Sequence, residues 1–210
     1  DLGRPWNIWR MIFFWQPESP LFEVGWCVML YLTVLALEFV PVIFEGLNWV
    51  KPLRLIRHVT LILVVAGIGL STLHQSSLGT LFLLAQDRMH PLWYSPILPL
   101  LFFVSAVGLG LMMVATESTV TSWLYHREGE WPQLRGLTRA ASIVLSIYFL
   151  LRLGDLAWRG EFGHFFDSSW MSFLFLVEIG LSVVVPILLF TLPWTSRTRW
   201  GVALGSFSGV

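Results

Sequence analysis

The sequence predicts an all-α protein, a polytopic bundle of transmembrane helices with about five spans, and three observations support this fold class. Hydrophobic residues make up 56% of the 210 residues. Charged residues make up only 12%, well below the roughly 25% of a typical soluble domain. The apolar residues are grouped into stretches of the length, about 20 helical residues, that crosses a bilayer. A soluble fold would leave large apolar patches exposed, so we expect lipid to be the solvent.

The apolar stretches predict five spans in order along the chain. They lie at about Leu21–Phe44, Ile56–Leu73 (with a continuation to Ser77 left open), Ile97–Thr116, Ala140–Trp158 and Ser172–Leu192. Pro20 lies at the start of the first span, where its missing N–H costs little, and Pro186 predicts a kink in the fifth. Leu78–Ala85 is too short to span and is expected to form an interfacial or re-entrant turn. The whole chain, 1–210, is predicted to be a single integral membrane domain, part of a larger bundle.

The distribution of basic residues predicts the orientation of these spans. One side of the membrane would carry the loops with Lys51, Arg54, Arg127, Arg135, Arg139, Arg197 and Arg199. The other side would carry Arg4, Arg10, Arg88 and Arg159. The positive-inside rule assigns the first side to the cytoplasm. The formal net charge is zero, so nothing indicates a nucleic-acid partner.

Ionisable and polar residues are concentrated at the outer ends of three spans. The second span ends in a run of polar residues, namely His74, Gln75, Ser76 and Ser77. In the fourth span Arg152 precedes Asp155 by three residues, so the two share a helix face and can pair. Glu178 lies about two turns inside the fifth span. Because ionisable groups are costly in hydrocarbon, their default interpretation is a functional site facing the bundle interior.

A site of this composition within apolar walls suits a quinone. The quinone headgroup has two oxygens that need hydrogen-bond partners, and its reduction takes up two protons. A histidine and a buried carboxylate can exchange those protons, and the isoprenoid tail needs only an apolar slot. Three alternatives stay open: a buried structural Arg152–Asp155 pair, a small-solute or proton transporter, and a purely structural membrane anchor.

The histidines and the single cysteine argue against a metal cofactor in this chain. Of the five histidines only His58 and His74 fall on predicted spans, and they lie on the same span about 24 Å apart. A haem held between helices needs axial ligands that face each other, so we expect no haem. Cys27 alone cannot hold an iron–sulfur cluster, and we expect no metal site.

Several sequence runs resemble the NrfD/polysulfide-reductase family of membrane subunits. They are Asp1-Leu-Gly-Arg-Pro-Trp, Leu21-Phe-Glu-Val-Gly-Trp-Cys and Leu35-Ala-Leu-Glu-Phe. The runs Ser71-Thr-Leu-His-Gln-Ser-Ser-Leu-Gly and His90-Pro-Leu-Trp-Tyr look most like the HybB branch, the quinone-reactive membrane subunits of periplasmic nickel–iron hydrogenases. Members of the family have more spans than five, so we expect this chain to be a fragment of a longer protein.

The resemblance implies a function, a location and a set of partners. It implies a haem-free, multi-pass subunit of a bacterial or archaeal cytoplasmic membrane, not catalytic alone. Such a subunit exchanges electrons between an extracytoplasmic ferredoxin-like iron–sulfur subunit, joined to a catalytic oxidoreductase subunit, and menaquinone or ubiquinone. It implies quinone residues at Asp1 and His74, with less support for Asp155. Candidate contacts to the iron–sulfur partner, or to lipid headgroups, are Arg4, Trp6, Trp9, Arg10, Arg88 and Trp93.

Overall fold

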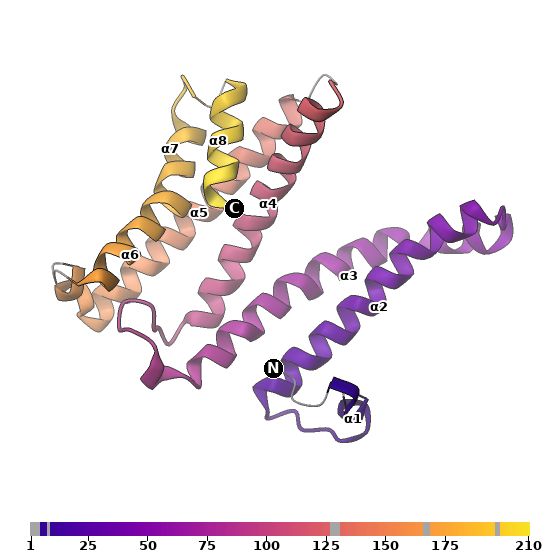
Figure 1. Ribbon diagram of the computed structural model, residues 1–210, viewed down its shortest axis with the longest axis horizontal. Coiled ribbons are helices and arrows are strands. Elements are labelled where there is room, and N and C mark those ends of the chain that lie inside the picture. The colour runs from indigo at the N-terminus through magenta and orange to yellow at the C-terminus, as the bar shows by residue number, and fades with distance from the viewer. Residues whose placement is uncertain (1–4, 8, 127–130, 166–168, 196–197) are drawn as a thin grey trace. The chain divides into compact units, whose positions relative to one another are not determined.

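A computed structural model describes residues 5–7, 9–126, 131–165, 169–195 and 198–210, and all regular structure in these ranges is helical (Figure 1). The prediction of an all-α fold is therefore confirmed. The elements are η1 (Pro5–Asn7), α1 (Arg10–Phe13), α2 (Pro20–Gly46), α3 (Val50–Leu83), η2 (Gln86–Arg88), α4 (Leu98–Leu124), α5 (Trp131–Arg159), η3 (Glu161–Phe165), α6 (Trp170–Ile179), the π turn η4 (Gly180–Val184), α7 (Val185–Thr191) and α8 (Arg199–Gly209).

Five helical segments in the described residues are long and apolar enough to cross a membrane, as the sequence predicts. They are Pro20–Gly46, Val59–Leu83, Leu98–Leu124, Trp131–Arg159 and Trp170–Thr191. Each helix extends beyond the predicted apolar stretch at one or both ends, because polar and aromatic residues continue the helix where the hydropathy has already fallen. The chain is therefore a multi-pass membrane protein.

The prediction for Leu78–Ala85 is wrong, because α3 continues through this segment to Leu83. The segment carries one polar side chain, Thr80, which does not break the helix, and the polar run that precedes it also stays helical. The Ser77 hydroxyl donates to Glu23 Oε1 of α2 over 2.7 Å, and the Thr80 hydroxyl donates to the Ser76 carbonyl over 3.5 Å. At 34 residues, α3 is about 51 Å long and exceeds the hydrocarbon thickness of a bilayer.

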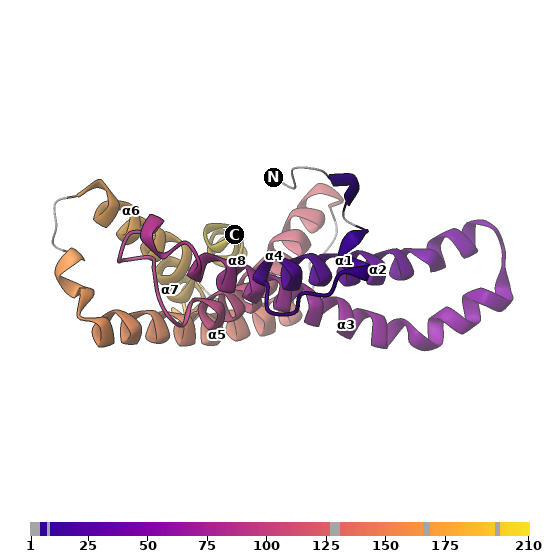
Figure 2. The ribbon, with the colours of Figure 1, turned by 90° about the horizontal axis from the view of Figure 1, so that it is seen from below.

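The chain divides into two compact units, residues 1–82 and 83–210. In the first unit α2 and α3 form a helical hairpin, and both Figure 1 and Figure 2 show them side by side. The missing side chain of Gly67 allows Glu38 and Val34 of α2 to approach α3: a Cβ there would lie 3.3 Å from Glu38 Oε1.

The second unit contains the more extensively buried core. In it α4 packs against α5, and α7 and α8 pack against these two helices. Three apolar clusters lie along the unit, formed by Met112, Ala141, Leu145, Val183 and Phe190, by Leu92, Leu156 and Phe175, and by Ala115, Leu134 and Val202. The cluster of Leu92, Leu156 and Phe175 joins the α3–α4 loop to α5 and α6, and it adjoins the candidate site.

The irregularity expected at Pro186 takes the form of a π turn, Gly180–Val184, between α6 and α7. Proline cannot donate to the carbonyl four residues earlier, and its ring crowds that carbonyl. A wider turn just before the proline accommodates both effects.

Close packing of α8 against α7 depends on Gly205, where a Cβ would lie 2.5 Å from the buried Phe190 ring. We expect Gly205→Ala to destabilise the protein by roughly 1–3 kcal/mol through overpacking. Gly110→Ala is the matched control, because a Cβ there meets nothing within 4 Å and alanine favours the helix. Thermal unfolding in detergent measures both variants, and equal melting temperatures would contradict this account of the α7–α8 contact.

Candidate functional site

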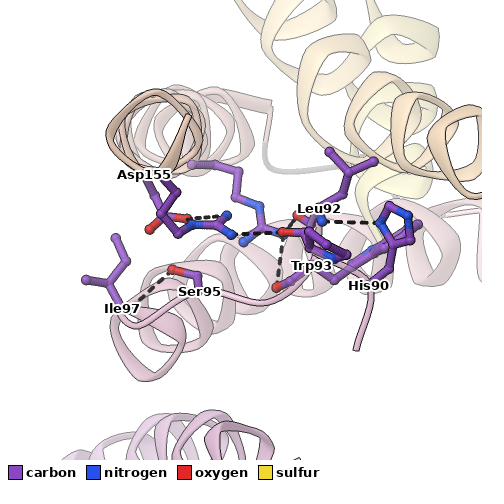
Figure 3. Close-up of polar contacts among 9 residues, drawn as sticks. His90, Leu92, Trp93, Ser95, Ile97 and Asp155 are labelled. Carbon is purple, nitrogen blue, oxygen red and sulfur yellow. Dashed lines mark hydrogen bonds and ion pairs between the residues drawn. The ribbon is translucent and has the colours of Figure 1, made fainter. Parts of the chain in front are cut away.

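The loop between α3 and α4 is a compact turn that presents its backbone carbonyl groups to α5. The His90 carbonyl accepts from the amides of Trp93 and Tyr94, and His90 Nδ1 accepts from the Leu92 amide over 3.3 Å. Ser95 Oγ accepts from the Ile97 amide over 3.1 Å, just before α4 begins (Figure 3). Leu92 and Ser95 are fully buried. These local bonds use the amides, so the carbonyl oxygens of residues 91–93 are free to bind elsewhere.

Two arginines of α5 bind those three consecutive carbonyls. Arg152 Nη2 donates to Leu92 O over 2.7 Å and to Trp93 O over 3.3 Å. Arg159 Nη1 donates to Pro91 O over 2.9 Å. Carbonyl groups cannot stay unsatisfied in hydrocarbon, and arginine supplies several donors in a fixed geometry. The two side chains therefore hold the loop against one end of α5. This is the outer end in the orientation predicted from the basic residues.

Asp155 forms its ion pair with Arg159 rather than with Arg152. Arg159 Nε and Nη2 lie 3.0 and 2.8 Å from Asp155 Oδ2, and both side chains are largely buried. The predicted i, i+3 pair does not form, because Arg152 extends to the loop carbonyls while Arg159, one turn after Asp155, is aligned with the carboxylate. Figure 3 shows Asp155 beside the loop residues that the arginines bind.

Aromatic residues complete the surroundings of Arg152. Its guanidinium lies 5.4 Å from the centre of the Phe175 ring of α6, a cation–π distance. The Trp93 ring meets Phe175 edge to face at 5.4 Å, and Trp93 Nε1 donates to Glu178 Oε2 over 2.6 Å. Arg152, Asp155 and Glu178, which the sequence predicts to share one depth, are thus gathered around a single loop of the second unit.

An apolar cavity of about 240 Å³ opens beside Arg152. Its walls come from α5, α6 and η4, and they are Phe149, Arg152, Leu153, Leu156, Phe175, Leu176, Ile179, Gly180 and Val184. Arg152 is only 4% exposed, and its Nε and Nη1 are buried without a hydrogen-bond partner among the described residues. A buried donor of this kind costs free energy unless it meets an acceptor. An acceptor oxygen would satisfy these two donors, and the cavity that borders Arg152 is apolar.

The other predicted site residues of the described chain lie in the first unit, on α3. His74 is half-buried, and its Nδ1 is buried without a partner among the described residues. Ser77 is buried and bonded to Glu23, with Cys27 Sγ 4.0 Å from its hydroxyl oxygen. Gln75 and Ser76 are half-buried. Ser77 thus has a packing partner, whereas His74 keeps an unused ring nitrogen.

The grouping of His74 with Arg152, Asp155 and Glu178 stays a prediction, because these residues belong to different units. Asp1 lies outside the described residues.

Two participants that the sequence analysis missed are Arg159, counted there only as a loop cation, and Trp93, assigned there to partner or headgroup contact. The i, i+4 spacing from Asp155 could have revealed Arg159. No local pattern indicated the Trp93–Glu178 bond, which joins residues 85 positions apart.

Comparison with known proteins gives one family for the whole chain. The family model described as polysulphide reductase, NrfD, matches residues 1–209. The chain is 38% identical over its full length to a protein of Nitratidesulfovibrio vulgaris, of which it covers 56%. No solved structure matches the chain.

Two further relatives have informative names. Over 85% of the chain, 34% of residues are identical to the probable Ni/Fe-hydrogenase 2 b-type cytochrome subunit of Escherichia coli, of which 47% is covered. Over 92% of the chain, 29% are identical to the menaquinone reductase, integral membrane subunit, of Nitratidesulfovibrio vulgaris, of which 51% is covered. The chain thus spans about half the length of the curated relatives it matches.

The arginine–carbonyl contacts predict how the loop responds when one of them is removed. Arg159→Gln should free the Pro91 carbonyl and unpair Asp155, so amide hydrogen exchange in residues 92–95 should accelerate at least tenfold, the effect of losing a charge-assisted bond. Arg88→Gln is the control, since Arg88 is exposed on η2 beside the same loop and carries the same charge. Unchanged exchange in Arg159→Gln, measured by mass spectrometry, would show that these bonds do not hold the loop.

Proposed function

The chain belongs to the polysulphide reductase NrfD family, and from this premise we propose that it forms part of a quinone-reactive subunit of a respiratory oxidoreductase complex. The subunit is haem-free and lies in a bacterial or archaeal cytoplasmic membrane, where the chain is one domain of a larger bundle. It exchanges electrons between an extracytoplasmic iron–sulfur subunit and menaquinone or ubiquinone. The name of one relative, a menaquinone reductase membrane subunit, supports the choice of substrate.

The observation that supports this function best is the buried guanidinium of Arg152. Nη2 is occupied by the loop carbonyls, which fixes the plane of the group, while Nε and Nη1 have no partner among the described residues. The cavity beside them is apolar apart from Arg152. A quinone oxygen is an acceptor that becomes more negative as the ring is reduced. Arg152 would therefore bind the ring that has gained electrons but is not yet protonated more strongly than the oxidised quinone or the neutral quinol.

Proton transfer needs groups that exchange protons near the headgroup, because quinone reduction takes up two electrons and two protons to give the quinol. The electrons come from the iron–sulfur partner. Asp155, oriented by Arg159, and Glu178, bonded to Trp93, supply two carboxylates near Arg152. His74, with an unused Nδ1, would bond the headgroup and exchange the other proton, assisted by Asp1. Gln75, Ser76 and Ser77 line the same end of α3.

The histidines described by the structure do not suit a b-type haem, although one relative is named a b-type cytochrome subunit. Among those whose side chains the structure describes, only His74 lies on a span. His90 and His164 do approach, with ring centroids 5.8 Å apart, but they belong to the α3–α4 loop and η3. His90 Nδ1 accepts from the Leu92 amide, and His164 Nε2 lies 3.1 Å from Glu161. Two histidines facing each other from two spans, as such a haem needs, are not formed by these residues.

The partner surface is proposed on the same predicted outer face as the site. Trp6 and Trp9 are exposed, at 71% and 51%, and the exposed Arg10 lies beside them. Exposed aromatic and arginine side chains are typical of protein interfaces. They would dock the ferredoxin-like iron–sulfur subunit, which in turn joins the catalytic oxidoreductase subunit.

If Arg152 binds the quinone, a substitution there should weaken quinone binding while the complex still assembles. Arg152→Lys keeps the positive charge but loses the planar set of donors. We expect the KM for a soluble quinone analogue to rise at least tenfold in the assembled complex, since a hydrogen bond from a charged donor is lost. Quinone reductase assays on the purified complex, with assembly checked by size exclusion, measure this.

Arg159→Gln is the comparison for Arg152→Lys, because it loosens the same loop and leaves every donor of Arg152 in place. It should raise the KM by a smaller factor. Equal effects of the two variants would assign the defect to the loop, and an unchanged KM in Arg152→Lys would exclude Arg152 from the quinone site.

His74→Ala separates a redox role from a purely structural one. We expect an assembled complex in which electrons still reach the iron–sulfur partner but quinone turnover falls by at least 100-fold, the loss typical of a removed acid–base group. His74→Gln, which keeps a hydrogen-bond donor but cannot exchange the proton, should restore binding without restoring turnover. Lost assembly in both variants, or normal turnover in either, would favour the anchor alternative.

A further inference from the structure

A second cavity, of about 640 Å³, lies at the other end of the second unit. It is lined by Arg135, Thr138, Arg139 and Ser142 of α5 and by Phe190, Thr191 and Pro193 at the end of α7. Arg139 and Arg152 are 13 residues apart on one helix, which corresponds to about 20 Å. This cavity is therefore separate from the candidate quinone site, and the proposed function makes no use of it.

The residues that line this cavity suit an anion. Arg135 and Arg139 are spaced i, i+4, so both lie on one face of α5, and both are exposed. The seven lining residues include no carboxylate. Arginine binds the oxygens of a phosphate through two parallel N–H donors. Two such side chains beside one cavity favour a phosphodiester group.

The hydroxyl groups behind the arginines favour a ligand that also donates hydrogen bonds. Thr138 Oγ1 donates to Arg135 O over 3.2 Å, and Ser142 Oγ donates to Thr138 O over 2.8 Å. Both residues are buried, and their hydroxyl hydrogens are used within α5. Their oxygens remain as acceptors. An alcohol group of the ligand can donate to them, whereas free phosphate at neutral pH offers mainly acceptors.

The position of the cavity indicates a membrane interface. Trp194 and Trp200 follow α7 and are 88% and 77% exposed, as in the aromatic belts at headgroup level. Leu188, one turn back along α7, is 49% exposed and continues the surface with apolar side chains. A ligand with a charged head and hydrocarbon chains would find both environments in order along this helix.

We propose that this cavity binds the headgroup of an anionic glycerophospholipid whose head carries free hydroxyl groups, as in phosphatidylglycerol. The phosphodiester lies between Arg135 and Arg139, the glycerol hydroxyls donate to Thr138 and Ser142, and the acyl chains follow α7. The predicted orientation places this lipid in the cytoplasmic leaflet, where basic pockets between helices meet anionic headgroups. The lipid links the ends of α5 and α7.

The test measures retained lipid on the full-length protein in its purified complex. The complex is reconstituted in nanodiscs of dioleoyl-phosphatidylglycerol and dioleoyl-phosphatidylcholine at a molar ratio of one to four, extracted in mild detergent and analysed by native mass spectrometry. We expect the wild type to retain phosphatidylglycerol. The double variant Arg135→Gln/Arg139→Gln should lower retained phosphatidylglycerol relative to phosphatidylcholine about 30-fold, the product of two cation–headgroup contacts. Arg135→Lys/Arg139→Lys should keep most of it.

Three results would overturn the proposal. The first is equal retention of phosphatidylglycerol by the wild type and the glutamine variant. The second is an equal loss in Lys51→Gln/Arg54→Gln, which removes two charges from the same predicted face but from the other unit, and would indicate general surface charge. The third is release of the lipid by about 10 mM inorganic phosphate in a background of about 0.15 M salt, the physiological ionic strength, which would make the site one for free phosphate. If the glutamine variant does not assemble, loss of phosphatidylglycerol in the assembled lysine variant would overturn the proposal, and retention would support it.

Discussion

The second unit depends on the contact between two arginines of α5 and three successive carbonyl groups of the α3–α4 loop. Irregular backbone at membrane depth is tolerated only where its polar groups are satisfied inside the protein. Here the donors come from Arg152 and Arg159, through bonds of 2.7–3.3 Å. The same contact explains why buried arginines are acceptable: the carbonyls compensate part of the cost of burying each guanidinium, and Asp155 balances one of the two charges.

This contact uses the two arginines unequally, and the difference has a chemical consequence. Arg159 is neutralised by Asp155 and anchored to Pro91, so it is part of the scaffold. Arg152 binds the loop through Nη2 and borders the apolar cavity. Its Nε and Nη1 have no hydrogen-bond partner among the described residues. A fixed, dry cation that faces an apolar cavity stabilises negative charge that develops on a bound molecule, and it needs no rearrangement to do so. The loop contact thus pre-orients the group on which the proposed quinone chemistry depends.

The sequence was sufficient for the spans, but not for the partners of the ionisable groups. Hydropathy locates helices because a bilayer imposes one length and one polarity on every span. It failed at residues 78–83, because hydropathy does not measure that Thr80 bonds within the helix and that Ser77, just before this segment, bonds to a neighbouring helix. It also could not separate Arg152 from Arg159 as the partner of Asp155, since both spacings put the side chains on one face. The loop carbonyls decided between them, and backbone acceptors carry no sequence signature.

The two ends of α5 show how one helix can use arginine for opposite purposes. At one end the guanidinium groups are buried and bonded to backbone, so their positions are set by the fold and only the unused donors of Arg152 can select a ligand. At the other end Arg135 and Arg139 are exposed beside an open cavity, with the hydroxyl oxygens of Thr138 and Ser142 behind them. In the two proposals, an exposed arginine attracts an anion through charge, whereas a fixed and desolvated one discriminates between oxidation states of a neutral ligand. Burial, rather than residue type, therefore distinguishes the proposed lipid contact from the proposed redox site along this helix.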